Sequence, residues 1–232
     1  MFEDLRAFIA GLEEAGELVR IREELSPLYE IPAAIREVDK QTGSAVFFEQ
    51  VKGYPIPVVG NLLARRSRLA LAMGIPEKEL VSEYTARRQR SIPPQIIDQA
   101  PIKEVIIDKD VRIADVIPVL THHQRDVGPY FTTAVTMAKD PVTGLRGMGV
   151  HRIQVKGDDT LGVFLATPPM SHFFQKAEER GQPLEVAIAI GLDPITFFSS
   201  IGEGAAAGRH HYEATNSRPR GISPVRHGRM RA

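Results

Sequence analysis

The sequence predicts an α+β protein built in two successive parts. Over the first 100 residues, segments with helical periodicity alternate with short strand-like runs, and beyond them the strand-like runs dominate. Pro93, Pro94 and Pro101 separate the two patterns, as is typical of a linker. We therefore expect an α/β domain over residues 1–100, a β-rich domain over residues 101–200, and a tail over residues 201–232.

The first domain is expected to begin with a helix. Asp4 is a residue type that caps helix amino termini, apolar residues recur at helical spacing over residues 5–12, and Gly16 follows them. Pro32 suits only the first turn of the next helix. The further elements expected here are strand 18–21, helix 31–38, strands 45–51 and 56–59, a short helix 69–73 and a polar helix 77–90.

The second domain is expected to contain a β-hairpin. Asp140-Pro-Val-Thr-Gly144 is a turn sequence, because Pro fixes φ early in the loop and Gly adopts a positive φ late in it. We interpret the flanking residues 131–138 and 148–155 as the two strands. The other elements expected here are strands 103–107, 161–166 and 184–190 and a helix over residues 169–180.

The second hairpin strand carries two polar side chains at strand spacing. Period-2 alternation places Arg152 and Gln154 on one face and His151, Ile153 and Val155 on the other. An Arg and a Gln two residues apart can hold an anion or the polar edge of a flat ligand. Taken alone, an Arg in a strand is more often a surface or salt-bridged residue.

Several motifs of this chain together resemble one enzyme family. Gly128-Pro-Tyr130, Asp140-Pro-Val-Thr-Gly144 and Gly149-Val-His-Arg-Ile-Gln154 resemble the core of the UbiD-type carboxy-lyases. The segments that begin at Asp4, Phe47 and Pro183 are similar to the same family, and the matches run in order over residues 1 to about 200. The family consists of reversible decarboxylases of aromatic and α,β-unsaturated acids that use prenylated FMN.

The resemblance implies a fold, a cofactor and a set of site residues. The second domain is expected to be a split β-barrel similar to FMN-binding flavin reductase folds. Arg152 is expected to be the catalytic Arg of a Glu-Arg-Glu network that contacts the substrate carboxylate, which suits a planar, permanently charged guanidinium. The residues expected to bind prenylated FMN are Thr132, Gly149, Val150, His151, Arg152 and Gln154. Thr132 is equally typical of a structural strand residue, Gly149 of a β-bulge, and Gln154 of a packing residue.

A divalent metal, Mn²⁺ or Mg²⁺, is also expected of the family. His172, near a predicted helix start, is the candidate metal ligand, and an ordinary helix-terminal His is the alternative. Gly147 occupies the position where the family carries a metal-binding Asn, so we expect the site to be weak. The neighbouring His122 and His123 are interpreted as loop residues, since adjacent side chains of an extended segment do not face one ion.

Composition excludes several classes of protein. The chain has 232 residues and no Cys, which excludes disulfides, thiolate catalysis and Cys-ligated metal sites. The start lacks a basic and apolar signal pattern, and no apolar run approaches membrane-spanning length. We expect a cytoplasmic protein without a membrane span, and a homo-oligomer by family resemblance.

The tail differs from the rest of the chain. Residues 201–232 contain six Arg and two Glu, a net charge of +4, so residues 1–200 carry −4 within a net charge of zero. We expect the tail to be disordered, because its apolar content is low. Its composition is what translation of a GC-rich gene in a shifted frame would give, and a natural tail is the alternative. The resemblance also implies that the carboxy-terminal half of the family fold is missing from this chain.

Two other functions compete with a decarboxylase. A flavin- or nucleotide-binding module without lyase activity would need no proton donor beside Arg152. Nucleic-acid binding through the Arg-rich tail is disfavoured, because aromatic residues do not alternate with the arginines and the body is acidic. We therefore expect a small aromatic or unsaturated carboxylic acid, and no nucleic acid, as the partner.

Overall fold

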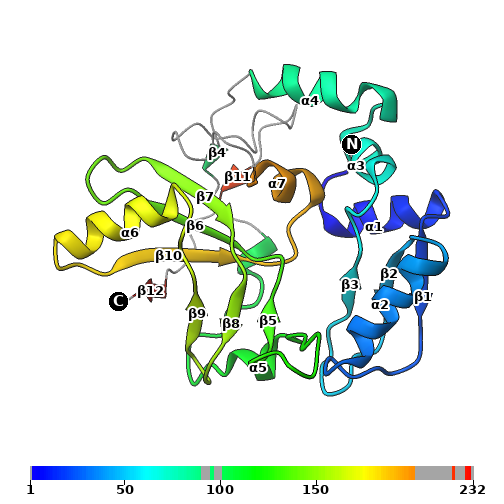
Figure 1. The fold of residues 1–232 in the computed structure, drawn as a ribbon, viewed down its shortest axis with the longest axis horizontal. Coiled ribbons are helices and arrows are strands. Elements are labelled where there is room, and N and C mark those ends of the chain that lie inside the picture. The colour runs from blue at the N-terminus through cyan, green and yellow to red at the C-terminus, as the bar shows by residue number, and fades with distance from the viewer. Residues whose placement is uncertain (1, 90–94, 97–100, 202–220, 223–227, 231–232) are drawn as a thin grey trace. The chain divides into compact units, whose positions relative to one another are not determined.

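The structure, a computed structural model, describes residues 2–89, 95–96, 101–201, 221–222 and 228–230 (Figure 1). It divides into two compact units that are interleaved along the chain. The first unit comprises Met1–Leu80, Ile107–Thr132 and Arg152–Val163, and the second comprises Val81–Ile106, Thr133–His151 and Phe164–Ala232. The α+β class is confirmed by the helices and sheets of both units. The domain boundary at residue 100 stays a prediction.

The amino-terminal part of the first unit is a three-stranded sheet with helices. Strand β2 (Ala45–Phe48) pairs in parallel with β1 (Leu18–Ile21) and antiparallel with β3 (Val58–Gly60). Helix α1 (Leu5–Glu14) begins where the Asp4 side chain accepts a hydrogen bond from the Ala7 N–H at 2.8 Å. Helix α2 (Glu30–Gln41) packs on the sheet through a core of Ile31, Val46, Phe48 and Val51. The helices and strands predicted here are confirmed, with ends shifted by a few residues.

A buried arginine links the loops of this part. Arg68, on helix α3 (Arg66–Met73), is 0% exposed and donates to the carbonyl oxygens of Gly43, Asn61 and Leu62 at 2.8–3.0 Å. Its guanidinium also lies 3.0 Å from a carboxylate oxygen of Glu17. Each of its three guanidinium nitrogens therefore has an acceptor within the protein, as a buried charge requires.

The polar helix predicted over residues 77–90 begins differently. A 3₁₀ turn, η1 (Glu77–Glu79), precedes the α-helix α4 (Leu80–Arg88).

The prediction of a strand over residues 103–107 is wrong. The 3₁₀ turn η2 (Pro101–Lys103) is followed by irregular chain in which Val105 and Ile106 are 78% and 67% exposed. Their β-propensity forms no strand because no described strand pairs with them.

The rest of the first unit is a second small sheet. Strand β8 (Ile153–Val155) lies between β5 (Tyr130–Phe131) and β9 (Leu161–Val163), antiparallel to both. A one-turn helix, α5 (Ile113–Val116), precedes this sheet along the chain. Isolated bridges join Leu28 to Thr121 and Leu120 to Tyr130, so the chain leading into β5 is tied to the loop before α2.

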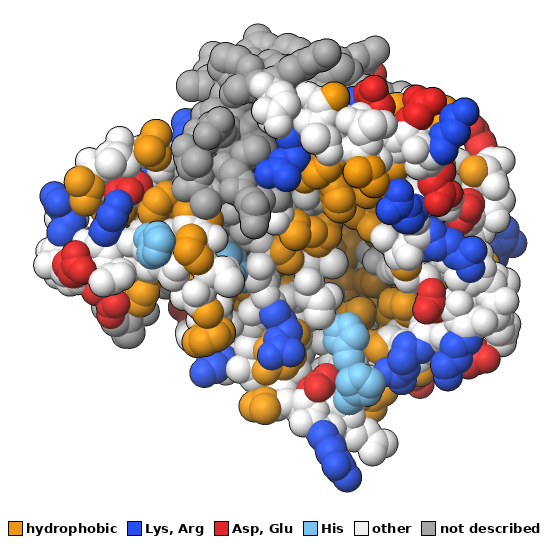
Figure 2. Space-filling view, turned by 45° about the horizontal axis from the view of Figure 1, so that its top comes forward, with side chains coloured by type: hydrophobic (Ala, Val, Ile, Leu, Met, Phe, Trp, Pro, Cys, Tyr) orange, Lys and Arg blue, Asp and Glu red, His pale blue; other side chains and the backbone are white. Residues whose placement is uncertain are grey.

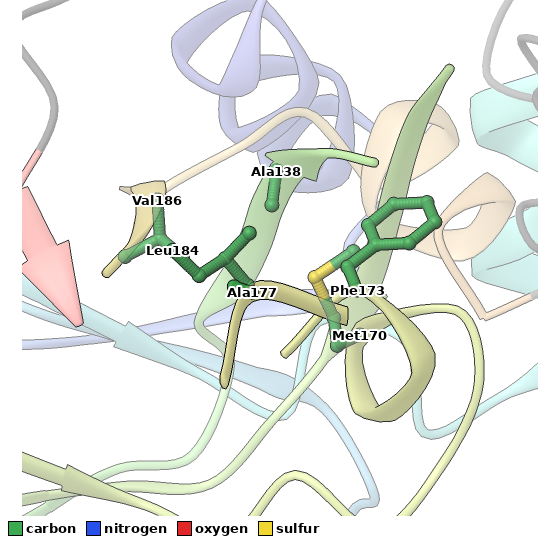
Figure 3. Close-up of a cluster of buried hydrophobic side chains, with 6 residues drawn as sticks. All are labelled: Ala138, Met170, Phe173, Ala177, Leu184 and Val186. Carbon is green, nitrogen blue, oxygen red and sulfur yellow. The ribbon is translucent and has the colours of Figure 1, made fainter. Parts of the chain in front are cut away.

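The second unit is built on an antiparallel sheet of order β12-β10-β6-β7. Its strands are β6 (Val135–Lys139), β7 (Arg146–Val150), β10 (Leu184–Ala189) and β12 (Gly228–Met230). Helix α6 (Met170–Glu179) packs on this sheet, and Figure 3 shows the side chains between them. That core consists of Ala138, Met170, Phe173, Ala177, Leu184 and Val186.

Two shorter features complete the second unit. Asp193 caps helix α7 (Pro194–Ser199), accepting hydrogen bonds from the Ile195 and Thr196 N–H groups at 3.1 Å. Strand β4 (Gln95–Ile96) pairs in parallel with β11 (Gly221–Ile222). Strands β11 and β12 are the described parts of the tail beyond residue 201, and the prediction of a disordered tail otherwise falls outside the described residues. None of the described helices is both long and apolar enough to cross a membrane.

The hairpin is present, but each of its predicted strands is broken. Strands β6 and β7 pair around the Asp140–Gly144 turn as expected, with Thr136 opposite Gly149. The predicted strand 131–138 is interrupted at residues 132–134, and 148–155 is interrupted at residues 151–152. The outer pieces, β5 and β8, belong to the other sheet. The prediction of two continuous strands was therefore wrong. The chain bends where it passes from one sheet to the other, and the alternation of apolar and polar residues does not reveal such a bend.

Candidate active site

Arg152, Tyr130 and Gln154 lie on one face of the β5-β8-β9 sheet. Tyr130 is the register partner of Gln154, so both side chains leave the sheet on the same side. The Arg152 guanidinium carbon lies 4.9 Å from the centroid of the Tyr130 ring, which places it on that side as well. Ile153, between Arg152 and Gln154, is fully buried. The alternation predicted for residues 152–154 is therefore confirmed.

The Arg152 guanidinium is exposed and has no acidic partner among the described residues. Arg68, by contrast, uses its donors on carbonyls and a carboxylate within the protein. Planar guanidinium donors without a protein partner can bind a carboxylate or phosphate through two parallel hydrogen bonds. The chemistry available at Arg152 is therefore anion binding.

His151, in the second unit, is a buried imidazole that is only half satisfied. It is 6% exposed, its Nδ1 lies 3.1 Å from the Gly149 carbonyl oxygen, and its Nε2 is buried without a described hydrogen-bond partner. Burial lowers the pKa of His151, because water no longer solvates the imidazolium, while the Gly149 carbonyl acts in the opposite direction. With Nδ1 donating to that carbonyl, Nε2 is an acceptor.

Gly149 lies against this imidazole, and Thr136 lies opposite Gly149 in the neighbouring strand. A Cβ on Gly149 would lie 3.0 Å from the His151 ring, so the ring occupies the space that any larger residue at 149 would need. Thr136 is opposite Gly149 across the β6–β7 pair and faces the same side. Its hydroxyl is also buried without a described partner, and Thr136 is 1% exposed. Two unpaired polar atoms thus lie on one face of this hairpin.

The remaining predicted cofactor residues are placed as follows. Thr132 is exposed in the bend after β5, in the first unit. Val150 ends β7 in the second unit and packs beside the buried pair Val135 and Met148. The predicted flavin-binding residues are therefore divided between the two units, and their roles stay predictions.

The residues predicted around a metal do not form a metal site. His172 is exposed on α6, and the described residues contain no group of three or more His, Asp or Glu side chains that could hold an ion. A Cβ at Gly147 would lie 2.6 Å from Pro169 and 2.8 Å from Phe173. An Asn side chain does not fit there without moving the core under α6. His172 is then the predicted ligand that remains, and a lone imidazole among the described residues does not suit Mn²⁺ or Mg²⁺, which prefer several oxygen ligands.

An ion pair between a buried carboxylate and a partly exposed lysine fixes the turn of the hairpin. One Asp140 carboxylate oxygen accepts hydrogen bonds from the Val142 and Thr143 N–H groups at 2.8 and 3.2 Å. The other lies 2.6 Å from Lys176 Nζ on α6. Burial opposes ionisation of Asp140, but the Lys176 ammonium and the two N–H donors outweigh it and lower its pKa to about 2. The turn and the helix are therefore joined by a charged contact.

The histidine loop before β5 is organised by an aspartate. One carboxylate oxygen of Asp126 accepts hydrogen bonds from the His122 and His123 N–H groups at 3.2 and 2.9 Å. The His123 ring lies 3.4 Å from an Arg36 nitrogen. Burial lowers the pKa of His122, which Asp126 partly opposes. These contacts agree with the interpretation of both histidines as loop residues.

Sequence reasoning missed two residues of these surfaces. Tyr130 stood in the Gly-Pro-Tyr motif without a role, and its position opposite Gln154 could have been found only from the strand register. Thr136 was one of several Thr residues in a strand, a type that usually signals β-propensity alone. Neither carries a sequence signal that distinguishes it from a structural residue.

Two domain profiles of one family match most of this chain. Residues 9–88 match the 3-octaprenyl-4-hydroxybenzoate carboxy-lyase N-terminal domain, and residues 95–213 match the Rift-related domain of the same carboxy-lyase. Among curated relatives, a phenolic acid decarboxylase from Sedimentibacter hydroxybenzoicus is 34% identical over 219 residues, which cover 88% of this chain and 46% of that protein. An anhydromevalonate phosphate decarboxylase from Methanothermobacter thermautotrophicus is 31% identical, with 84% and 44% covered.

Solved structures give the same result. The UbiD-class enzyme HmfF from Pelotomaculum thermopropionicum, in an evolved dimeric form with prFMN, superposes with a TM-score of 0.90 at 35% identity, over 96% of this chain and 53% of that one. The vanillic acid decarboxylase of Sedimentibacter hydroxybenzoicus superposes with a TM-score of 0.86 at 31% identity, over 97% and 50%. The chain therefore spans about half the length of the relatives that it matches.

Proposed function

This chain belongs to the UbiD family of carboxy-lyases, and on that premise we propose that it forms the amino-terminal part of a decarboxylase. The proposed substrates are aromatic or α,β-unsaturated carboxylic acids, and the proposed cofactor is prenylated FMN. The observation that carries the proposal is the Arg152 guanidinium, which is exposed, stacked on Tyr130 and without a described acidic partner. Such a group suits the carboxylate that a decarboxylase must hold.

The residues present fit a flavin. The unpaired Nε2 of His151 and hydroxyl of Thr136 suit a ligand that offers both donors and acceptors, as a flavin ring does. We propose that Thr132, Gly149, Val150, His151, Arg152 and Gln154 contribute to binding it. Prenylated FMN would supply an electron sink for the charge left as CO₂ departs, while the protein supplies position and electrostatics.

The part of this chain in the reaction is to bind and orient the acid. Arg152 would hold the substrate carboxylate by two parallel hydrogen bonds, and Gln154 on the same face would add an amide donor and acceptor. The product carbon must then receive a proton, and no described carboxylate forms an ion pair with Arg152 from which to deliver it. We propose that the acid comes from residues beyond this chain, so that the chain alone turns over weakly.

The metal is not part of this proposal, because the described residues around Gly147 and His172 do not fit it.

We also propose that the second domain is a split β-barrel. Its support is that the chain passes from a strand of one small antiparallel sheet to a strand of another at residues 132–134 and 151–152. A cytoplasmic homo-oligomer is likewise proposed by family resemblance.

A flavin-binding module without lyase activity is the second candidate. It is favoured by the same missing proton donor, since binding needs Arg152 but not an acid beside it. Nucleic-acid binding is less suited. On the face drawn in Figure 2, basic and acidic side chains are interspersed over the described residues rather than gathered into one positive surface.

One assay separates these candidates. The chain is loaded with prenylated FMN, and CO₂ release is followed from a panel of aromatic and acrylic acids, with Arg152→Ala as the variant. Retained flavin with little turnover supports an incomplete decarboxylase, and addition of the second half of a family member should then restore activity. Robust turnover by the chain alone would refute the incomplete site, and failure to bind any flavin would refute the family cofactor.

A further inference from the structure

We propose that Tyr130 is the positioning residue of Arg152: its ring holds the guanidinium flat so that the outer donor edge faces a carboxylate. The inference rests on the proposed function, in which Arg152 binds the substrate carboxylate. Four observations carry it, and all lie in the first unit.

The first is the distance between the guanidinium and the ring. The guanidinium carbon lies 4.9 Å from the ring centroid, within the range in which the electron-rich face of an aromatic ring attracts a cation. A guanidinium on a ring face keeps its N–H groups in plane and directed outward. It can therefore stack on one side and still form two parallel hydrogen bonds with a carboxylate.

The second is the absence of another anchor. No described acid pairs with Arg152, although many of the arginines described have an acidic neighbour, among them Arg20, Arg68 and Arg87. Arg152 is also exposed, so a long side chain with several rotatable bonds would otherwise sample many positions. The ring of Tyr130 is the described contact that limits this freedom.

The third is that Tyr130 is itself fixed. Its backbone N–H donates to the Leu120 carbonyl oxygen at 3.0 Å, and the residue pairs with Gln154 across the β5–β8 ladder. Tyr130 is half-buried, whereas Arg152 is exposed. An aromatic ring on a paired strand, in contact with an exposed cation, is an arrangement that pre-organises a binding group.

The fourth is that Arg152 contacts the ring of Tyr130 and not its hydroxyl. The Tyr130 hydroxyl forms no described hydrogen bond. The ring rather than the hydroxyl therefore does the positioning, so Phe should replace Tyr130 and Leu should not.

The test uses the full chain, with and without bound FMN, and benzoate as the carboxylate probe. Calorimetry gives benzoate affinities for wild type, Tyr130→Phe, Tyr130→Leu, Arg152→Gln and the Tyr130→Leu/Arg152→Gln double variant. Arg88→Gln is the matched control, because Arg88 also stacks on an aromatic ring, at 5.6 Å from Tyr84. NMR of the Arg152 Nε–Hε group reports stacking directly through the ring-current shift.

We expect Tyr130→Leu to weaken benzoate binding about 2- to 5-fold, the range for one exposed cation–π contact. The loss should vanish in the Arg152→Gln background, Tyr130→Phe should match wild type, and Arg88→Gln should change nothing. The upfield shift of the Arg152 Hε should persist in Tyr130→Phe and disappear in Tyr130→Leu. A merely structural Tyr130 would weaken binding equally in both backgrounds.

The two failures are distinguishable. If Arg152→Gln weakens benzoate binding and Tyr130→Leu does not, the positioning role is wrong and the proposed role of Arg152 stands. If Arg152→Gln leaves benzoate binding unchanged, both are wrong. An equal loss from Tyr130→Leu in both backgrounds, or an Arg152 Hε shift that does not depend on the ring, overturns the positioning role alone.

Discussion

Replacement of Asp140 by Asn should destabilise the second unit in a pH-dependent way. The variant keeps an oxygen for the Val142 and Thr143 N–H groups but loses the charge that faces Lys176. The pKa of Asp140 falls from 3.8 to about 2 on folding. At about 1.4 kcal/mol per pKa unit, that shift corresponds to roughly 2.5 kcal/mol of stability.

The expected effect is smaller than this figure. The Lys176 side chain is 39% exposed, so solvent screens the pair, and we expect a loss of about 1–2 kcal/mol at pH 7. Because the folded pKa is depressed, the stabilisation is complete above the unfolded pKa near 4. It is lost as the pH falls toward 2, where both states are protonated.

Urea unfolding of wild type and Asp140→Asn at pH 7, 5, 4 and 3 measures this difference. The gap in unfolding free energy should be constant between pH 7 and 5 and should narrow below pH 4. Glu178→Gln, an exposed change on α6, serves as the control and should be neutral. A gap that stays the same down to pH 3, or that is absent at pH 7, would refute the account of Asp140.

Three further changes test other parts of the structure. Arg68→Met should cost about 3–5 kcal/mol in urea unfolding, because three carbonyls and Glu17 lose their donor, and a cost under about 1 kcal/mol would show that the guanidinium is dispensable. Gly147→Asn should lower the melting temperature and leave Mn²⁺ binding unchanged by calorimetry, because its side chain collides with Pro169 and Phe173; tighter Mn²⁺ binding would contradict this. Thr136→Val should leave the free energy of unfolding unchanged or raise it in the absence of flavin, because the hydroxyl has no described partner. If the flavin uses that hydroxyl, the variant should also weaken FMN retention in fluorescence titrations. A loss of about 1 kcal/mol or more in unfolding free energy without flavin would indicate a bound water instead.

Local signals predicted the amino-terminal elements well. Asp4, the apolar face of α1 and the apolar run of β2 are properties of short segments, and such segments can be predicted without knowledge of distant partners. The hairpin turn followed from Pro141 and Gly144 for the same reason. The family was readable from ordered motifs, and the domain profiles confirm it.

Features that depend on distant partners were not readable. The bends at residues 132–134 and 151–152 arise because β5 and β8 join a different sheet from β6 and β7, which no local pattern encodes. The segment predicted as a strand over residues 103–107 has a suitable composition, but none of the described strands pairs with it. The burial of Arg68 was not predicted, because three of its acceptors are backbone carbonyls, which every residue carries.

The Arg68 contacts also have a consequence for local unfolding. The Arg68 guanidinium, carried by α3, donates to the carbonyl oxygen of Gly43 and to those of the neighbouring loop residues Asn61 and Leu62. These two segments cannot open one at a time without leaving a buried cation short of acceptors. In native-state amide exchange they should open together with α3 as one cooperative unit, at a single opening free energy, although 25 residues separate Gly43 from Arg68 in the chain.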